Sequence, residues 1–258
     1  MKLVLQKKYT LTVATLSLCL LSLPLFASRG SGPSWSYEGA TGPEHWGELA
    51  PEFALCGSGL EQSPVDIDDE QDASLPVLLA NYKSAPVAIE NNGHTVQHNI
   101  SNGSQLKIGT QEVQLLQYHL HTPSEHTVNG ASYPMEIHFV HKTSNGQLAV
   151  LGVFVRTGEY NSALEQVLKY SPKKKGSNHV PTISIDLQKL LPRNVTSNYV
   201  HYQGSLTTPP CSQGVKWFVN QTPITASAQQ IAKFKQLFHG LNARPTQDLN
   251  NRVIYERD

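Results

Sequence analysis

The chain contains many short β-like runs, several of which alternate apolar and polar residues, and Gly, Asn and Pro separate these runs. Alternation with a period of two is typical of strands that bury one face, and the separating residues are typical of turns. The clearest runs cover residues 85–92, 94–100, 104–121, 135–142, 148–155 and 215–220. The pattern predicts a large, mainly antiparallel β structure.

Two other segments have helical signals instead. Asn161–Ser171 has apolar residues at helical spacing, with Asn161 or Ser162 as its N-cap. Thr225–Leu241 has a similar pattern and ends near Gly240. We expect both helices to be short and to lie at the periphery of the β structure.

The N-terminus has the layout of a secretory signal peptide. Three lysines within the first eight residues precede an apolar run over residues 11–27. We expect cleavage near Ala27 or Ser28, and an exported protein that is periplasmic or extracellular. An uncleaved membrane anchor is the alternative, but the run contains Pro24 and is short for a span.

One domain is expected after this segment. Residues 28–34 read as a flexible lead-in, and residues 35–258 contain no linker, no repeat and no stretch able to span a bilayer. Signal removal takes away three of the 20 basic residues and none of the 20 acidic ones, which leaves a net charge of −3. That charge argues against nucleic acid or another polyanion as a partner.

Cysteine usage agrees with export. The predicted mature chain keeps Cys56 and Cys211, and two cysteines in an exported protein indicate one disulfide. It would close a loop of about 150 residues, which is worth roughly 5 kcal/mol in the chain-entropy model. Two buried free thiols are the alternative.

Residues 115–141 hold five of the eleven histidines, and strand parity divides them. Alternate side chains of a strand face the same way, so Gln117, His119 and His121 share one face. In the next run, Glu136 and His138 share a face by the same rule. A His-x-His pattern also occurs by chance, so the pair on the first run is a weak signal by itself.

The segment between the two runs contains Pro, Asn and Gly, so the runs can pair as a hairpin. Paired strands lie about 4.8 Å apart, and His119, His121 and His138 can then converge on one ion. Three imidazoles with a fourth position left for water describe a catalytic zinc site, whereas structural zinc sites are four-coordinate and rich in Cys.

The polar neighbours of these histidines fit the same interpretation. A zinc-bound imidazole gives its other N–H to an acceptor, and Gln117 and Glu136 each lie two residues before a candidate ligand, on its face. His141 falls on the opposite face from His138, which excludes it as a ligand. His126 lies in the segment that connects the two runs, so strand parity does not decide whether it is a ligand.

The segment "QYHLHTPSEHTVNGASYPMEIHFVH" resembles the zinc-binding core of the α-class carbonic anhydrases. Further motifs resemble family motifs in family order, from about Trp35 to the C-terminus. They are "GPEHWG", "QSPVDI", "NNGHTV", "LAVLGVF", "SLTTPPC" and "NARPTQ". The resemblance implies a single catalytic domain built on a large, twisted, mostly antiparallel sheet of about ten strands, with short peripheral helices.

By this resemblance, His119, His121 and His138 bind one Zn²⁺ per chain. The family catalyses the reversible hydration of carbon dioxide to bicarbonate and a proton through a zinc-bound hydroxide. Carbonic anhydrases are the standard example of zinc lowering the pKa of a bound water to near 7, and this pKa is known from that family. A weak esterase side activity is also implied.

Two further residues carry catalytic roles by resemblance. Thr207 matches the threonine whose hydroxyl accepts a proton from the zinc-bound hydroxide and donates its own to an acid, here Glu125. Donation requires Glu125 to be ionised. His94 matches the histidine that shuttles the product proton to solvent, a role that suits a group titrating near neutral pH.

The resemblance also implies supporting residues. Asn242 lies near the backbone carbonyl that orients His121, and His126 becomes a structural histidine bonded near Glu136. The substrate pocket is assigned to Val140, Val150, Leu206, Thr208 and Trp217, and the ordered-water lining to Tyr37, Asn92 and Gln97. Gln97 stands where the family often has Asn. Cys56 and Cys211 match a disulfide common in exported members, and Pro64 and Pro210 match frequent cis prolines.

Two alternatives belong to other functional classes. One is a non-catalytic carbonic-anhydrase-like binding domain, and the other is a periplasmic zinc-binding protein. Non-catalytic domains typically lose a zinc histidine, and zinc carriers tend to use mobile loops, whereas these ligands are predicted on strands. Exported bacterial members are often dimers, so a homodimer is an alternative to a monomer.

Overall fold

The computed structural model describes residues 33–238 and 240–257, which form one compact unit. The predicted signal peptide and most of the lead-in lie outside the described residues. Pro33 and Ser34 belong to no regular element. Among the described residues, none of the helices has the length and apolar character needed to cross a bilayer.

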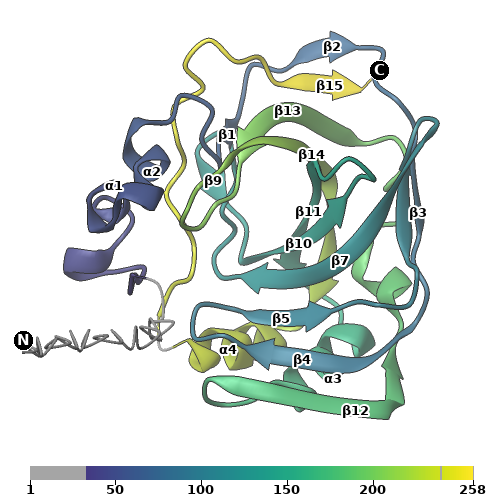
Figure 1. Ribbon diagram of the computed structural model, residues 1–258. Coiled ribbons are helices and arrows are strands. Elements are labelled where there is room, and N and C mark those ends of the chain that lie inside the picture. The colour runs from purple at the N-terminus through teal and green to yellow at the C-terminus, as the bar shows by residue number, and fades with distance from the viewer. Residues whose placement is uncertain (1–32, 239, 258) are drawn as a thin grey trace, which may run out of the picture. The chain divides into compact units, whose positions relative to one another are not determined.

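The unit is mainly β, as the alternating pattern predicts (Figure 1). Its strands are β1 (Asp66–Ile67), β2 (Gln71–Ala73), β3 (Leu78–Asn81), β4 (Ala85–Asn91), β5 (Val96–Asn99), β6 (Gln105–Ile108), β7 (Gln111–His121), β8 (Thr127–Val128), β9 (Ala131–Ser132), β10 (Met135–Lys142), β11 (Leu148–Thr157), β12 (Gly176–Ile185), β13 (Tyr199–Ser205), β14 (Gln213–Ala226) and β15 (Tyr255–Arg257). Its α-helices are α1 (Trp46–Leu49), α2 (Leu55–Ser58), α3 (Ser162–Tyr170) and α4 (Ala228–Leu237). Short 3₁₀ turns cover Gly39–Thr41, Pro51–Phe53 and Leu187–Leu190.

Twelve strands form one sheet, whose central order is β12-β4-β5-β7-β10-β11-β14-β13-β15-β2, with β6 paired to β7 and β3 paired to β6. Within it only the β11–β14 and β15–β2 pairs are parallel, so the prediction of a large, mostly antiparallel sheet is confirmed. A small second sheet joins β1, β8 and β9.

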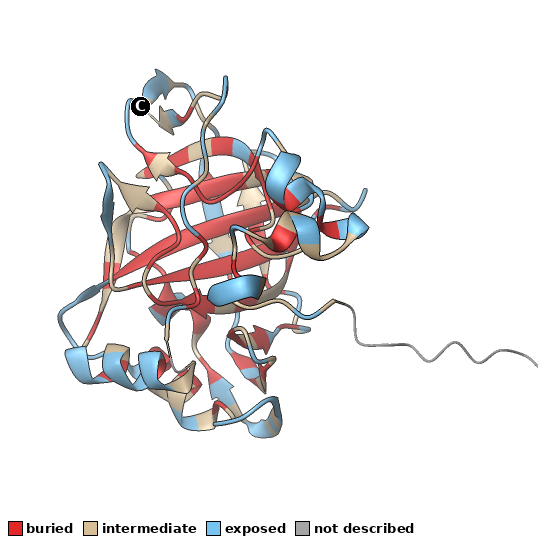
Figure 2. Cartoon of the chain, turned by 90° about the vertical axis from the view of Figure 1, so that its left-hand side faces the viewer, coloured by how far each residue is buried: buried red, intermediate tan, exposed pale blue. Residues whose placement is uncertain are grey.

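The two faces of the central strands have different environments. Residues of one parity, such as Tyr118, Leu120 and Phe139, are fully buried in the larger apolar core. Residues of the other parity include His119 and His121 of β7, His138 of β10 and a smaller apolar cluster around Trp217. Figure 2 shows these central strands as the buried interior of the unit. The sheet therefore supports the candidate site on one face and is anchored by its core on the other.

The two predicted helices exist, but both boundaries of the second differ from the expectation, since it ends at Leu237 and not near Gly240. Asn161 caps α3, because its Oδ1 accepts from the backbone N–H groups of Ala163 and Leu164 at 3.0 Å each. The second helix begins later than expected, since Thr225 and Ala226 complete β14. Ser227 then caps α4 in a capping box with Gln230.

The disulfide expected from cysteine counting is present. Cys56 of α2 is bonded to Cys211, with Cα atoms 5.1 Å apart and a sequence separation of 155. Pro64 and Pro210 follow cis peptide bonds as expected, and Pro123 follows a third that was not predicted. The bridge ties the N-terminal helices to the segment after β13 that carries Thr207.

Candidate metal centre

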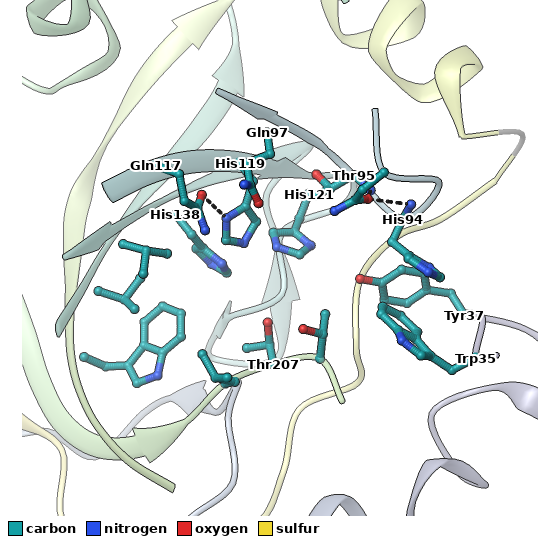
Figure 3. A pocket seen from close by; sticks show the side chains of 16 residues that line it. Trp35, Tyr37, His94, Thr95, Gln97, Gln117, His119, His121, His138 and Thr207 are labelled. Carbon is teal, nitrogen blue, oxygen red and sulfur yellow. Dashed lines mark hydrogen bonds between the residues drawn. The ribbon is translucent and has the colours of Figure 1, made fainter. Parts of the chain in front are cut away.

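The cavity on the histidine-bearing face of the sheet has a volume of about 240 Å³ (Figure 3). The residues assigned to the site line it, apart from Glu125, Glu136 and Asn242, which lie behind its wall. The lining consists of Trp35, Tyr37, Asn92, His94, Thr95, Gln97, Gln117, His119, His121, His138, Val140, Val150, Leu206, Thr207, Thr208 and Trp217. Segments that are far apart in the sequence, from Trp35 near the N-terminus to Trp217, therefore meet at this cavity.

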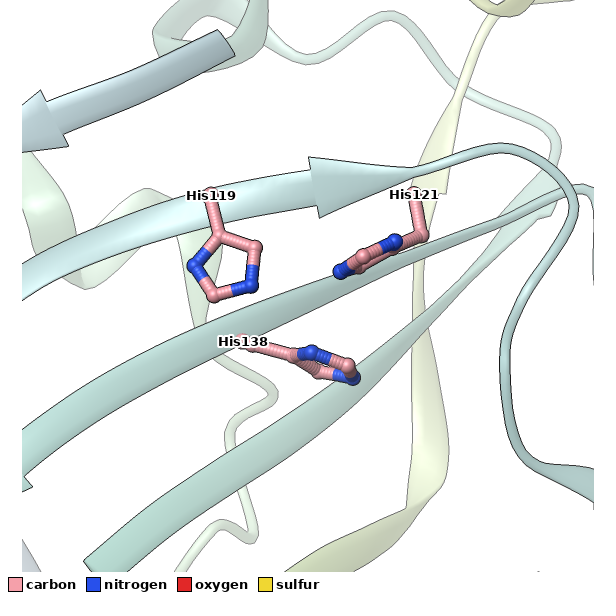
Figure 4. Close-up of side chains that lie close together, drawn as sticks. All are labelled: His119, His121 and His138. Atoms are coloured by element: carbon pink, nitrogen blue, oxygen red, sulfur yellow. The ribbon is translucent and has the colours of Figure 1, made fainter. Parts of the chain in front are cut away.

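Strand pairing brings the three candidate ligands together. His119 and His121 lie on β7, and His138 of β10 pairs directly with His119 in the antiparallel register. One nitrogen from each ring lies within 4.8 Å of the others, and Figure 4 shows the three rings turned toward a common region. The hairpin predicted from the sequence is the arrangement that makes this convergence.

Each ring is held through its other nitrogen. Nδ1 of His119 lies 2.9 Å from Oε1 of Gln117. Nδ1 of His121 lies 2.6 Å from the carbonyl oxygen of Asn242. These contacts leave Nε2 of both rings for the cavity.

In His138 the two ring nitrogens have the opposite roles, with Nε2 held by the protein. Its Nε2 lies 2.9 Å from Oε1 of Glu136, although this contact does not form a regular hydrogen bond. Both groups are fully buried and carry opposite charges when His138 is protonated, so the contact is attractive. Nδ1 of His138 is thereby left for the cavity.

The donor set fits a zinc ion. All three nitrogens belong to imidazoles, and the buried Nε2 of His121 has no hydrogen-bond partner. Burial holds the pKa of His119 well below its ordinary value, and burial also lowers the pKa of His121. Neutral imidazole is the form that binds a metal. For His138, burial lowers the pKa but the nearby Glu136 carboxylate outweighs it, so the net shift is upward.

Glu136 is the centre of a buried hydrogen-bond network. Its Oε2 accepts from the backbone N–H groups of Glu125 and His126 at 2.9 and 3.0 Å, and its Oε1 lies 2.8 Å from Nδ1 of His126. Burial raises the pKa of the Glu136 carboxyl, but His126 and His138 more than reverse this and hold it well below the usual range. His126 is fixed on its other side by the Tyr202 hydroxyl at 2.7 Å.

Glu125 lies behind the ligands with one oxygen bonded. Its Oε1 accepts from the backbone N–H of Arg244 at 2.9 Å. Its Oε2 lies 3.5 Å from Nε2 of His121 and 3.8 Å from Nδ1 of His138, and no hydrogen bond reaches it. Thr207 lines the cavity, but the hydrogen bonds of the described residues include none between Thr207 and Glu125. The pairing of these two groups stays a prediction.

His94 stands at the edge of the cavity beside two aromatic rings. Oδ1 of Asn92 accepts from the backbone N–H groups of His94 and Thr95, at 2.9 Å each, which forms a turn. The His94 ring is stacked on Trp35, and Tyr37 lies next to the pair (Figure 3). Asn92 therefore fixes the backbone of His94 in this turn, and it also lines the cavity.

The remaining wall divides into polar and apolar parts. The Tyr37 hydroxyl is buried without a hydrogen-bond partner, while Nε2 of Gln97 donates to Oδ1 of Asn99 at 2.6 Å. On the apolar side, Val150 pairs with both Val140 and Trp217 in the sheet register. The Trp217 indole N–H donates to the carbonyl of Ser205 at 2.9 Å, which turns its ring toward the cavity wall.

The comparison with known families decides the assignment. A family model described as eukaryotic-type carbonic anhydrase matches residues 41–258. The chain belongs to the α-class carbonic anhydrase family. Enzymes of this family act on carbon dioxide and bicarbonate, so the enzyme class predicted from the motifs is confirmed.

Relatives match the chain over most of its length. A carbonic anhydrase of Nostoc sp. is 44% identical over 89% of this chain and 88% of its own length. A carbonic anhydrase of Pectobacterium atrosepticum is 40% identical over 91% of this chain and 96% of its own length.

Solved structures agree with this assignment. The α-carbonic anhydrase from Thermovibrio ammonificans, in complex with the inhibitor sulfanilamide, has a TM-score of 0.84 and 43% identity, and covers 88% of this chain and 100% of that one. A dioscorin complexed with ascorbate has a TM-score of 0.78 and 33% identity, and covers 86% of this chain and 97% of that one.

Histidines outside the carbonic anhydrase cavity contact other parts of the unit. His141 faces the opposite core, where Nε2 lies 2.7 Å from the Tyr82 hydroxyl and Nδ1 lies 3.1 Å from the carbonyl of Ala149. No role was predicted for five others, and four of these, His45, His98, His179 and His201, do not line the cavity. The fifth, His239, lies outside the described residues.

Three residues that lie in the cavity wall or contact the assigned residues received no site assignment from the sequence. Trp35 follows the lead-in and gives no local signal. Arg244 lies in the matched "NARPTQ" motif, and its buried guanidinium donates to the carbonyl of Cys56 at 2.8 Å while its backbone N–H holds Glu125. Gly152 lies in the matched "LAVLGVF" motif, opposite His138.

Proposed function

We propose that this protein is a zinc enzyme that catalyses the reversible hydration of carbon dioxide to bicarbonate and a proton. The observation that carries the proposal is the arrangement of His119, His121 and His138. One nitrogen of each ring faces a shared cavity, and the other is held by a group fixed in the sheet or the C-terminal segment. Such an arrangement presents three ligand atoms without a large change of the protein.

Zinc held by these rings supplies a nucleophile near neutral pH by lowering the pKa of a coordinated water, a property for which carbonic anhydrases are the standard example. The chain supplies the geometry. Gln117, Glu136 and the Asn242 carbonyl fix the ring orientations, and such outer contacts typically change metal affinity by about 10- to 100-fold.

Thr207 and Glu125 orient the attacking group. The Thr207 hydroxyl accepts a hydrogen bond from the nucleophile and donates its own proton to Glu125. Support comes from the placement of Thr207 on the cavity wall and from the buried Oε2 of Glu125, which has no other hydrogen bond. The Arg244 backbone N–H occupies the other oxygen, so the carboxylate presents Oε2.

Carbon dioxide is uncharged and weakly polar, so an apolar wall suits it. Val140, Val150, Leu206 and Trp217 provide that wall next to the histidines, and Thr208 adds a polar group at its edge. His94 then takes the product proton through water ordered by Tyr37, Asn92 and Gln97. Burial, followed by the charge of Lys175, lowers the pKa of His94 from its ordinary value, which keeps the ring able to accept a proton at neutral pH.

Metal analysis coupled to stopped-flow hydration tests this proposal. We expect one zinc per chain and accelerated hydration, and we expect His119→Ala to lose both zinc and activity while it keeps the fold. His179→Ala is a matched control, because that histidine lies on β12 and does not line the cavity. A zinc-loaded protein that does not accelerate hydration would refute the enzyme function.

A non-catalytic binding domain is the second candidate, because a dioscorin that shares the fold with a TM-score of 0.78 was solved in complex with ascorbate, which is neither carbon dioxide nor bicarbonate. The three histidines, Thr207 and His94 line one cavity and Glu125 lies directly behind its wall, and this set favours catalysis over a non-catalytic domain. A periplasmic zinc carrier is less consistent with ligands on central strands. Zinc binding without hydration would favour these alternatives.

Export belongs to the same proposal. The apolar run over residues 11–27 and the Cys56–Cys211 disulfide both support a signal peptide and an oxidising compartment, either the periplasm or the exterior. N-terminal sequencing of the mature protein should find cleavage near Ala27 or Ser28. Light scattering will distinguish a monomer from the homodimer that the resemblance leaves open.

A further inference from the structure

Gly152 is placed at the centre of the sheet, between two side chains of the site face. It lies on β11, pairs with His138 of β10 on one side and pairs with Val219 of β14 on the other. The position is buried, and its φ is not in the left-handed region. Conformational freedom of glycine is therefore not the reason for its presence here.

The space above Gly152 is filled by the Glu136 carboxylate. A Cβ atom at residue 152 would lie 2.9 Å from Oε1 of Glu136 and 3.5 Å from both methyl carbons of Val219. The Val219 distances are ordinary van der Waals contact, but the Glu136 distance is shorter than real Cβ contacts. A methyl group here would have to displace the carboxylate.

That carboxylate has no free direction in which to move. Its Oε1 lies 2.8 Å from Nδ1 of His126 and 2.9 Å from Nε2 of His138, and its Oε2 holds two backbone N–H groups. Glu136 is fully buried, so any lost contact cannot be replaced by solvent. A shift of the carboxylate must change how His126 or His138 is held.

We propose that Gly152 is a positioning residue of the metal centre. Its missing side chain creates the space in which the Glu136 carboxylate lies between His126 and His138, and it acts on the ligand His138 only through Glu136. This inference rests on the proposed zinc binding by His119, His121 and His138.

Zinc affinity, measured by competition with a chelator, tests the proposal. Gly152→Ala should weaken zinc binding by about 10- to 100-fold, the range for loss of an outer contact to a ligand. Gly57→Ala is the matched control, because its Cβ would make only an ordinary 3.6 Å contact, with Gly47, and it should bind zinc like the wild type. The melting temperature of each zinc-free variant separates loss of affinity from loss of fold.

A double-mutant cycle with Glu136→Ala identifies the route of the effect. Removing the carboxylate removes the clash, so Gly152→Ala should add no further loss of affinity in that background. The double variant should also fold when Glu136→Ala folds, even if Gly152→Ala by itself does not. In a Val219→Ala background, by contrast, the effect of Gly152→Ala should persist.

Three outcomes would overturn the inference. They are wild-type zinc affinity in Gly152→Ala, an equal additional loss in the Glu136→Ala background, and failure of the double variant to fold when Glu136→Ala folds. If the wild-type protein binds no zinc, the proposed function fails together with this inference. If the wild type binds zinc and hydrates carbon dioxide, a negative result in the variants rejects only the role of Gly152.

Discussion

The imidazole of His94 is stacked on the indole of Trp35, with ring centroids 3.7 Å apart and ring planes 10° apart. The stack covers one face of the candidate proton shuttle and leaves the ring beside the cavity. Burial is the main cause that lowers the pKa of His94, and Lys175 contributes in the same direction. The position and the basicity of the shuttle are thus set partly by a residue that is distant in sequence.

Replacing His94 should slow proton release and leave the attack on carbon dioxide intact. We expect His94→Ala to lower kcat in weak buffer by about 100-fold, the low end of the range for a lost proton-transfer group, with kcat/KM nearly unchanged. Exogenous imidazole should restore part of the rate. Stopped-flow hydration at low and high buffer concentration checks this, and an unaffected kcat in weak buffer would remove His94 from the shuttle role.

Replacing Trp35 should change the pH dependence of the same step. Trp35→Ala uncovers the His94 ring, so its lowered pKa should rise toward the ordinary value of 6.5. The inflection of kcat against pH should then move to higher pH, whereas Trp35→Phe should keep most of the stack. An NMR titration of His94 that shows the same pKa in wild type and Trp35→Ala would contradict the effect of burial.

Thr207 should matter through its hydroxyl group. Thr207→Ala should lower kcat/KM by about 100-fold, a typical cost of a misoriented reacting group, while zinc content stays at the wild-type level. Thr207→Ser keeps the hydroxyl and should retain most of the activity. Comparable losses in the two variants would mean that the side chain acts by packing, not by orienting the nucleophile.

The disulfide should contribute substantially to stability. It joins cysteines 155 residues apart in sequence, and the chain-entropy model gives roughly 5 kcal/mol for a loop of that size. Reduction should lower the melting temperature by about 10–20 °C for a domain of this length. The variant with Cys56→Ser and Cys211→Ser should melt like the reduced protein and should not respond to reductant, and an unchanged Tm on reduction would contradict the prediction.

His141 should make the protein sensitive to acid. Burial lowers the pKa of His141 to about 4, and in the unfolded chain the group has its ordinary pKa of 6.5. The neutral ring therefore contributes stability above pH 6.5 that is lost as pH falls toward 4, roughly 3 kcal/mol in all. Urea unfolding of His141→Gln should show a smaller decrease between pH 7 and pH 4.5 than the wild type. Equal decreases would assign the acid sensitivity to other groups.

Local patterns in the sequence predicted the elements that carry the ligands. The short β-like runs predicted β7, β10 and β11, and parity separated His119, His121 and His138 from His141, because side chains alternate regardless of what the strand pairs with. The edge strand β12 was missed, since its exposed polar residues and Pro181 do not show the alternation of a half-buried strand. The start of α4 was wrong because the β14 pairing extends to Ala226.

The sequence by itself determined the strand faces, the cysteine pair and, through motifs in family order, the family. Only the tertiary structure decided that Trp35 covers His94, that Arg244 holds Glu125, and that Gly152 leaves room for the Glu136 carboxylate. Strand parity is a local property of the backbone and can be read from adjacent residues. Contacts between segments up to 119 residues apart depend on how the sheet twists and on which loops cross its face, and no local pattern encodes that.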